Sequence, residues 1–149
     1  MIIRRAVEAD IAPAAALMAQ AYATHFRPII GDAAFGFDRA HFEARFAREL
    51  AELTVLDAEG LRGVLLVRDG YIAMLFAAET GRGHGAALLA HAEAHGAQSL
   101  EVFAANEGAR RFYERAGWQV MRDYEREFAG ATHRFLRYEK PMIPARRQG

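Results

Sequence analysis

The sequence contains no cysteine, which excludes disulfide bonds and thiolate chemistry and leaves only histidine and carboxylates to hold a zinc ion. It has no apolar run near the roughly 20 residues that a membrane-spanning helix needs. The opening residues MIIRRAVEADIAP lack the apolar core of a signal peptide. Basic and acidic residues balance at 19 each, so no bulk charge favours nucleic acid or an anionic membrane. We therefore expect a cytoplasmic protein that binds neither.

The 149 residues suffice for one domain with a single core. Hydrophobic patterns and turn residues predict strands over 1–7, 53–57, 63–67, 71–77 and 99–103, and two long strands over 118–140. Helices are expected after Asp10 and Asp38 as caps, over 86–95, and after Asn106. Segment 24–37 contains proline and glycine and is expected to be a loop. The order predicts one α+β domain over 1–142 around a mixed sheet, followed by a polar tail over 143–149.

A glycine-rich segment, ETGRGHGAALLAHAE, joins an expected strand to an expected helix at residues 79–93. Such a turn directs several backbone N–H groups to one point, and the helix dipole adds positive potential there. Gly81, Gly83 and Gly85 allow close approach, and Arg82 adds a cation, so the segment suits a phosphate. A tight connection that merely needs glycine is an equally good interpretation. The absence of GK[ST] excludes a Walker-type loop, and no acidic residue follows a second strand as a dinucleotide-binding fold requires.

A second cluster, LEVFAANEGARRFYERAGW, covers residues 100–118. Asn106 lies where a strand ends and a helix begins, so its side chain caps that helix or reaches a ligand. Ala109, Phe112, Tyr113 and Ala116 share one helical face, which by itself indicates that Tyr113 is a core aromatic. Capping and packing are the more common roles of such residues, and the functional alternatives stay open here.

The two clusters together resemble the GNAT superfamily of acyl-CoA N-acyltransferases. MLFAAETGRGHGAALLAHAE is similar to the family pattern LFVxPxxRGxGxGxxLL, and the second cluster is similar to LxVxxxNxxAxxFYxxxGF. Asn106, Ala109, Phe112, Tyr113 and Gly117 all fall in the register of the second pattern. The resemblance extends over nearly the whole chain. In the first cluster the loop is shorter than the usual form, its proline is missing, and Thr80 stands where the family has Arg or Gln.

The resemblance implies a donor site for acetyl-CoA between a splayed fourth and fifth strand of a central, mostly antiparallel sheet flanked by helices. Pantetheine would pair with main-chain groups of Leu75, Phe76 and Ala77. The pyrophosphate would be held by loop amides of Gly81, Arg82, Gly83, His84, Gly85 and Ala86. Asn106 would bind the pantetheine arm, and Tyr113 would be the general acid that protonates the departing thiolate.

The implied reaction transfers an acetyl group to a primary amine of a small molecule or peptide, by direct attack through a tetrahedral intermediate. Contacts to this acceptor would come from Tyr22, His25, Phe26, Arg27 and Tyr71, and Asp123 and Glu125 are further candidates. The resemblance leaves open the general base, the acceptor, the acyl chain length and whether the protein forms a homodimer.

Two alternatives remain. HAEAH places His91 and His95 four residues apart, the spacing of a zinc helix. No glutamate directly follows the first histidine and no third ligand is evident, so we expect no metal and a helix whose buried face is Leu88, Leu89 and Ala92. The second alternative is an acyl-CoA-binding sensor without turnover, which the altered loop at Thr80 favours and the retained Tyr113 disfavours.

Overall fold

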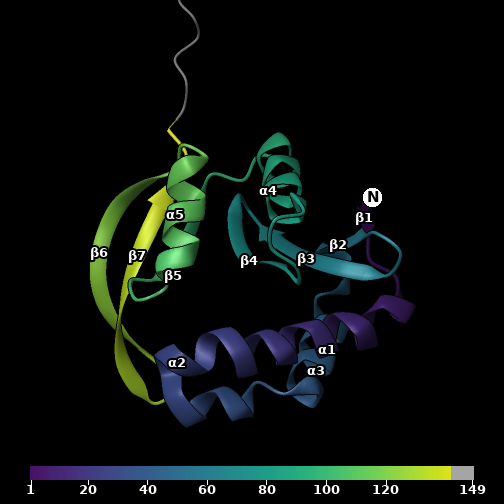
Figure 1. Ribbon diagram of the computed structural model, residues 1–149, viewed down its shortest axis with the longest axis horizontal. Coiled ribbons are helices and arrows are strands. Elements are labelled where there is room, and N and C mark those ends of the chain that lie inside the picture. The colour runs from purple at the N-terminus through teal and green to yellow at the C-terminus, as the bar shows by residue number, and fades with distance from the viewer. Residues whose placement is uncertain (142–149) are drawn as a thin grey trace, which may run out of the picture.

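The computed structural model describes residues 1–141, so the tail expected over 143–149 lies outside the described residues. Seven strands form one sheet in the order β1-β2-β3-β4-β5-β7-β6 (Figure 1). β4 and β5 are parallel, and each of the other neighbouring pairs is antiparallel. The strands are β1 (Ile2–Arg5), β2 (Leu53–Asp57), β3 (Leu61–Arg68), β4 (Tyr71–Ala77), β5 (Ser99–Phe103), β6 (Gln119–Phe128) and β7 (Ala131–Glu139). This is the mixed, mostly antiparallel sheet predicted from the sequence.

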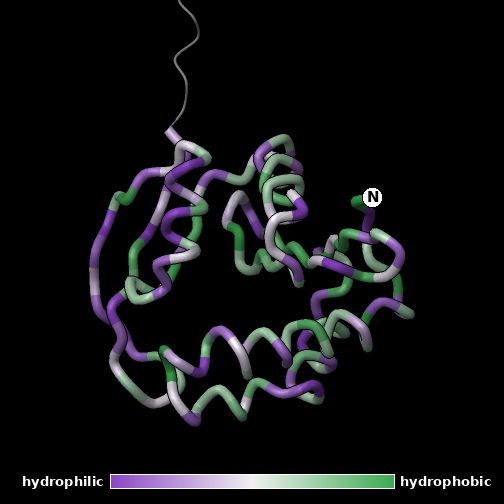
Figure 2. Tube along the Cα trace, viewed as in Figure 1, coloured by the Kyte–Doolittle hydropathy of each residue, from purple (hydrophilic) through white to green (hydrophobic). Residues whose placement is uncertain are grey.

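Helices cover both faces of the sheet. The helices are α1 (Ile11–Ala21), α2 (Arg27–Ile30), α3 (Arg39–Arg48), α4 (His84–Ala94) and α5 (Glu107–Arg115). Successive residues of β3 face opposite ways: Leu66 packs with α1 and α3, whereas Leu65 packs with α4 and α5. The inner strands are accordingly hydrophobic, while the edge strand β6 is mostly hydrophilic (Figure 2). Within residues 1–141, no helix is long and apolar enough to cross a membrane.

The turn signals in the sequence lie where they were expected. Asp69 and Gly70 both have positive φ, 53° and 79°, and form the tight connection between β3 and β4. Asp38 caps α3 by accepting a hydrogen bond from His41 N at 2.9 Å. The Gly-rich segment ends in α4, which begins two residues before the expected Ala86, and β4, α4 and β5 form the predicted crossover.

The expected loop over 24–37 is helical instead. α1 continues into a π-helical turn (Tyr22–Phe26), then α2, then a 3-10 segment (Gly31–Gly36). Pro28 is tolerated because it lies in the first turn of α2, where its missing N–H costs no helical hydrogen bond. Tyr22 and Phe26 are four residues apart and stack at 4.5 Å between ring centroids. A stacked pair four residues apart is a contact that a helical path allows.

The predicted cap at Asp10 is also different. Its side chain does not cap α1 but accepts hydrogen bonds from Arg4 Nη1 and Val7 N, each at 2.8 Å. The hydrogen bond from Arg4 lowers the pKa of this carboxyl group. Asp10 therefore ties the start of α1 to β1.

Gly63 allows α4 to lie close against β3. A Cβ at this position would lie 2.7 Å from Leu88 Cδ1 and 3.1 Å from the carbonyl oxygen of Phe76. Leu88 is fully buried, so it has little room to move. We expect Gly63→Ala to lower the free energy of unfolding by roughly 1–3 kcal/mol, the usual cost of overpacking a core. Urea unfolding measures this, with Gly36→Ala as control because no atom lies within 4 Å of a Cβ there. Equal midpoints for the two variants would contradict the packing argument.

Candidate active site

The site is built around the gap between β4 and β5. In the described residues these strands pair at two positions, Tyr71 with Ser99 and Ile72 with Leu100. The pairing of β4 with β3 then skips Ala73, a bulge that bends β4 at this point. Beyond it the strands diverge, and a cleft of about 430 Å³ opens between them. The splayed fourth and fifth strands predicted from the sequence are confirmed.

The cleft crosses the sheet from one face to the other. On the face covered by α4 and α5, its lining includes Asn106, Ala109 and Tyr113. On the opposite face, Tyr22 and Phe26 line it from the helical segment that follows α1. Of the residues predicted for the site, the cleft brings together Tyr22, Phe26, Tyr71, Leu75, Phe76, Asn106 and Tyr113. It therefore offers one opening to a ligand held by α4 and α5 and another to a ligand held by α1 and β6–β7.

The glycine-rich loop lies between the end of β4 and the start of α4. Gly81 and Gly83 have φ of 77° and 78°, and Gly83 is the N-terminal cap residue of α4. Ala87 N makes the first helical hydrogen bond, to Gly83 O at 3.0 Å. The N–H groups of His84, Gly85 and Ala86 precede that bond, so they lie at the helix end where an anion is favoured. No protein atom lies within 4 Å of a Cβ built at Gly81 or Gly83, so the main chain here is open to a ligand.

The side chains of this loop are less available to a ligand than its main-chain N–H groups. Arg82 is exposed and its Nε lies 4.0 Å from a Glu79 carboxylate oxygen, so its charge is partly balanced. His84 is buried, and its Nδ1 has no hydrogen-bond partner among residues 1–141. Ala77 ends β4, and together with Phe112 it faces Gly85 at the start of α4. A Cβ at Gly85 would lie 3.4 Å from the Phe112 ring, so this glycine holds α4 against the helix that carries Tyr113.

Tyr113 is both a core residue and a cleft residue. Its side chain is 7% exposed and packs near Phe112, Trp118 and Tyr138, yet it also lines the cleft. Burial raises the pKa of the Tyr113 phenol, so the hydroxyl keeps its proton at neutral pH. The cleft is therefore lined by a neutral hydroxyl group on the side of α5.

Asn106 caps α5, as one of the two interpretations of the sequence predicted. Its Oδ1 accepts a hydrogen bond from Ala109 N at 3.2 Å, which leaves the side-chain NH₂ donors for a ligand in the cleft.

Substitutions at Asn106 separate these two roles. We expect Asn106→Asp to keep the cap and change stability little, while CoA binding weakens because the amide donor is lost. Asn106→Ala should reduce both, with a loss of about 1 kcal/mol in stability. Thermal unfolding and calorimetric titration with CoA measure the two effects. Equal CoA affinity for the Asp variant and the native protein would restrict Asn106 to capping.

The other residues expected near the acceptor are not among the residues that line the cleft. His25 is exposed, with its ring 5.7 Å from that of Phe76. Arg27 is exposed and turns to Asp32 at 3.6 Å and to the ring of Phe35 at 4.7 Å. Asp123 and Glu125 lie on the exposed strand β6, and Asp123 pairs with Arg134. Roles for these residues in acceptor binding stay predictions.

Several lining residues were not predicted from the sequence. They include the charged and aromatic residues Arg45, Arg68, Glu101, Phe103, Arg126, Phe128 and Phe135. Burial by itself raises the pKa of Glu101, but hydrogen bonds from Arg126 and Tyr124 outweigh it and hold the pKa below its usual value. Burial, and then the negative charge of Glu101, raises the pKa of Tyr71. One signal in the sequence could have indicated Glu101: it is the single acid inside the short strand SLEVF, and acids are rarely buried without a partner.

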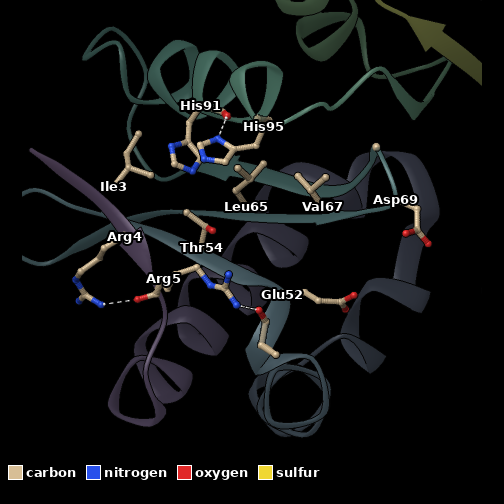
Figure 3. Close-up of a pocket in the computed structure, with 13 residues that line it drawn as sticks. Ile3, Arg4, Arg5, Glu52, Thr54, Leu65, Val67, Asp69, His91 and His95 are labelled. Carbon is tan, nitrogen blue, oxygen red and sulfur yellow. Dashed lines mark hydrogen bonds between the residues drawn. The ribbon is translucent and has the colours of Figure 1, made fainter.

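A second cavity, of about 600 Å³, lies at the other end of α4 (Figure 3). His91 and His95 face its floor of Leu65 and Val67, with Arg5 on the opposite side. The two imidazole rings stack at 4.2 Å, and His95 Nδ1 lies 2.8 Å from the carbonyl oxygen of His91. In the described part of the chain, no three His, Cys, Asp or Glu residues form a group that could hold a metal ion. Within residues 1–141, no third metal ligand therefore lies beside His91 and His95.

The fold is similar to that of several solved structures, some of which are described as acetyltransferases. The apo form of YjaB from Escherichia coli is 23% identical, with 93% of this chain and 97% of that chain covered and a TM-score of 0.74. A GCN5-related N-acetyltransferase from Rhodopseudomonas palustris is 22% identical, with 95% of each chain covered and a TM-score of 0.71. YncA from Salmonella typhimurium, solved with acetyl-CoA, is 18% identical, with 97% and 96% covered and a TM-score of 0.60.

Comparison with curated proteins finds no match. A protein-family model described as an acetyltransferase (GNAT) domain, however, matches residues 29–140, which include the glycine-rich loop and nearly all of the cleft. Because this match spans most of the chain, the protein belongs to the GNAT acetyltransferase family.

Proposed function

We propose that the protein transfers an acetyl group from acetyl-CoA to a primary amine. The observation that carries this proposal is the cleft between β4 and β5, which is lined by Tyr113 on one face of the sheet and by Tyr22 and Phe26 on the other. We call the side lined by Tyr22 and Phe26, where the acceptor would enter, the acceptor opening. Acetyl-CoA is bound in the structure of the related YncA. A through-sheet cleft suits a reaction in which donor and acceptor approach a common point from opposite sides.

The donor is held mainly by main-chain groups. The edge of β4 that faces the gap, near Leu75, Phe76 and Ala77, pairs with pantetheine as an added strand would. The amides from Gly81 to Ala86 bind the pyrophosphate at the N-terminus of α4. Thr80, in place of a basic residue, leaves this anion to the backbone amides and to the exposed Arg82. Asn106 donates its amide to the pantetheine arm.

The chemical step is a direct acyl transfer. The ammonium group first loses one proton to solvent, because an amine with a pKa of roughly 10 is protonated at neutral pH. The free amine attacks the thioester carbonyl carbon and forms a C–N bond, and an N–H of β4 stabilises the oxyanion of the tetrahedral intermediate. The C–S bond then breaks, and Tyr113 donates its proton to the departing thiolate. Tyr113 regains a proton from the amide nitrogen, so the products are an amide and CoA thiol.

A binding module without turnover is the second candidate, and the substitution at Thr80 is the observation that favours it. Mixing the protein with acetyl-CoA and a panel of primary amines, and measuring thiol release, separates the two functions. Amine-dependent thiol release supports the transferase and excludes the sensor. Thermal stabilisation by acetyl-CoA without release of thiol by any amine would contradict the transferase.

A further inference from the structure

We propose that the acceptor is a small amine with one ammonium group and an aromatic or similarly flat apolar body. This inference rests on the proposed acetyl transfer and names the substrate class of the same cleft. Three features of the acceptor opening support it: its aromatic walls, its distribution of charge and a contact between distant segments that bounds it.

Aromatic rings line both walls of the acceptor opening. Tyr22 and Phe26 form one wall, and Phe103, Phe128 and Phe135 form the other. Phe26 and Phe103 contact each other directly, with ring centroids 6.0 Å apart and planes tilted by 56°, while Phe103 lies 5.4 Å from Phe128 and 4.7 Å from Phe135. Such rings bind another ring by offset stacking or edge-to-face contact. They offer few hydrogen bonds to a hydroxyl-rich acceptor such as an aminoglycoside.

The charges in the cleft suit one ammonium group. Glu101 is the single acid among the described lining residues, beside the cations Arg45, Arg68 and Arg126. The arginines already have carboxylate partners: Arg45 and Glu49 at 2.9 Å, Arg68 and Glu52 at 2.8 Å, and Arg126 and Glu101 at 2.5 Å. A carboxylate has about four acceptor positions, so Glu101 can bind an ammonium group in addition to Arg126 and Tyr124. A second ammonium would face arginines and find no free acid, which disfavours a polyamine.

The acceptor opening is bounded by a contact between two distant segments, one of which carries the lining residue Phe128. Phe37, which precedes α3, stacks on Phe128 at the end of β6 with centroids 5.6 Å apart and ring planes 5° from parallel. This contact joins the segment after α2 to the tip of the β6–β7 hairpin, which curves toward α2 (Figure 1). An extended polypeptide would have to separate these two segments to cross the site. This contact therefore favours a small acceptor over a protein or peptide.

The test compares three amines of different class at saturating acetyl-CoA. We expect kcat/KM for 2-phenylethylamine to exceed that for spermidine and for a hexapeptide with a free N-terminus by roughly tenfold or more. The affinity of each amine for the protein–CoA complex, measured by calorimetry, should follow the same order without depending on turnover. Faster acetylation of spermidine or the peptide would overturn the acceptor class and leave the transferase intact. Failure to bind acetyl-CoA would overturn both.

Variants of Phe26 test whether the aromatic walls of the acceptor opening bind the amine. Phe26→Ala should weaken binding of 2-phenylethylamine to the protein–CoA complex by roughly tenfold, the loss expected for one buried aromatic contact, while the Kd for CoA stays unchanged. Phe26→Tyr keeps the ring and should retain binding. Phe35→Ala is the matched control, because Phe35 lies in the same helical segment but is 56% exposed and covers Arg27 instead of the cleft. Equal amine affinity for the Phe26→Ala and Phe35→Ala proteins would overturn the proposal.

Discussion

Tyr113→Phe is expected to lower kcat by roughly 100-fold or more while affinity for CoA stays nearly unchanged. The substitution keeps the ring, which packs near Trp118 and Tyr138, and removes only the hydroxyl. Burial raises the pKa of this phenol, so the hydroxyl is protonated at neutral pH and, in the proposed mechanism, donates that proton to the thiolate. Steady-state kinetics with a true amine acceptor measure kcat, and calorimetry measures the Kd for CoA.

Tyr138→Phe is the matched control for this experiment. Tyr138 lies in the same core with its ring 6.2 Å from that of Tyr113, but its hydroxyl donates to Glu114 at 2.6 Å and does not line the cleft. It should lose about 1 kcal/mol of stability and keep its kcat. Native kcat in a folded Tyr113→Phe protein, with chemistry shown to limit the rate, would remove Tyr113 from the mechanism and leave water as the proton source.

Gly83→Val is expected to abolish CoA binding without unfolding the protein. Gly83 has φ of 78°, a conformation that a β-branched residue adopts only with a strain of about 1–3 kcal/mol. The valine side chain would also occupy the open space beside the first amides of α4, which in our account is the space of the pyrophosphate. Calorimetric titration with CoA gives the affinity, and circular dichroism shows whether the fold survives.

Gly130→Val is the control for the backbone strain that valine causes at a position with positive φ. Gly130 has φ of 87° in the β6–β7 turn, and no atom lies within 4 Å of a Cβ there. This variant should lose comparable stability and keep its affinity for CoA. If the folded Gly83→Val protein binds CoA as tightly as the Gly130→Val protein, the glycine-rich loop is not the pyrophosphate site.

Arg82→Ala should weaken CoA binding far less than Gly83→Val. The Arg82 side chain is exposed, and its charge is partly balanced by the nearby carboxylate of Glu79. Its contribution to CoA affinity should shrink at high salt, because the charge of an exposed side chain is screened over about 10 Å at 0.1 M salt. Titrations at low and high salt measure the difference. An effect of Arg82→Ala that does not depend on salt would contradict this description.

The parts of the fold that depend on local signals could be predicted from the sequence. The Asp69-Gly70 pair predicted the hairpin, Asn106 and Gly117 predicted the limits of α5, and the glycine-rich segment predicted the start of α4 to within two residues. Each of these features is decided within a few neighbouring residues. The family pattern added the gap between β4 and β5, which no local signal indicates.

The acceptor side could not be predicted in the same way because it depends on contacts between distant segments. Phe26, Phe103 and Phe128 belong to three different parts of the chain, and their spacing in the sequence does not show that they meet. Segment 24–37 was expected to be a loop from its proline and glycine, whereas packing of its aromatic residues against β5 and β7 stabilises a helical path. Tertiary contacts outweighed local propensity there.

Transfer of an isotopically labelled acetyl group tests the central claim most directly. The protein is incubated with acetyl-CoA labelled in the acetyl carbons and with a panel of primary amines, and the products are analysed by mass spectrometry. The account predicts a labelled amide of at least one amine, formed in equal amount to free CoA, and no such product with the Gly83→Val protein. Binding of acetyl-CoA to the native protein with the thioester intact in the presence of every amine would contradict it.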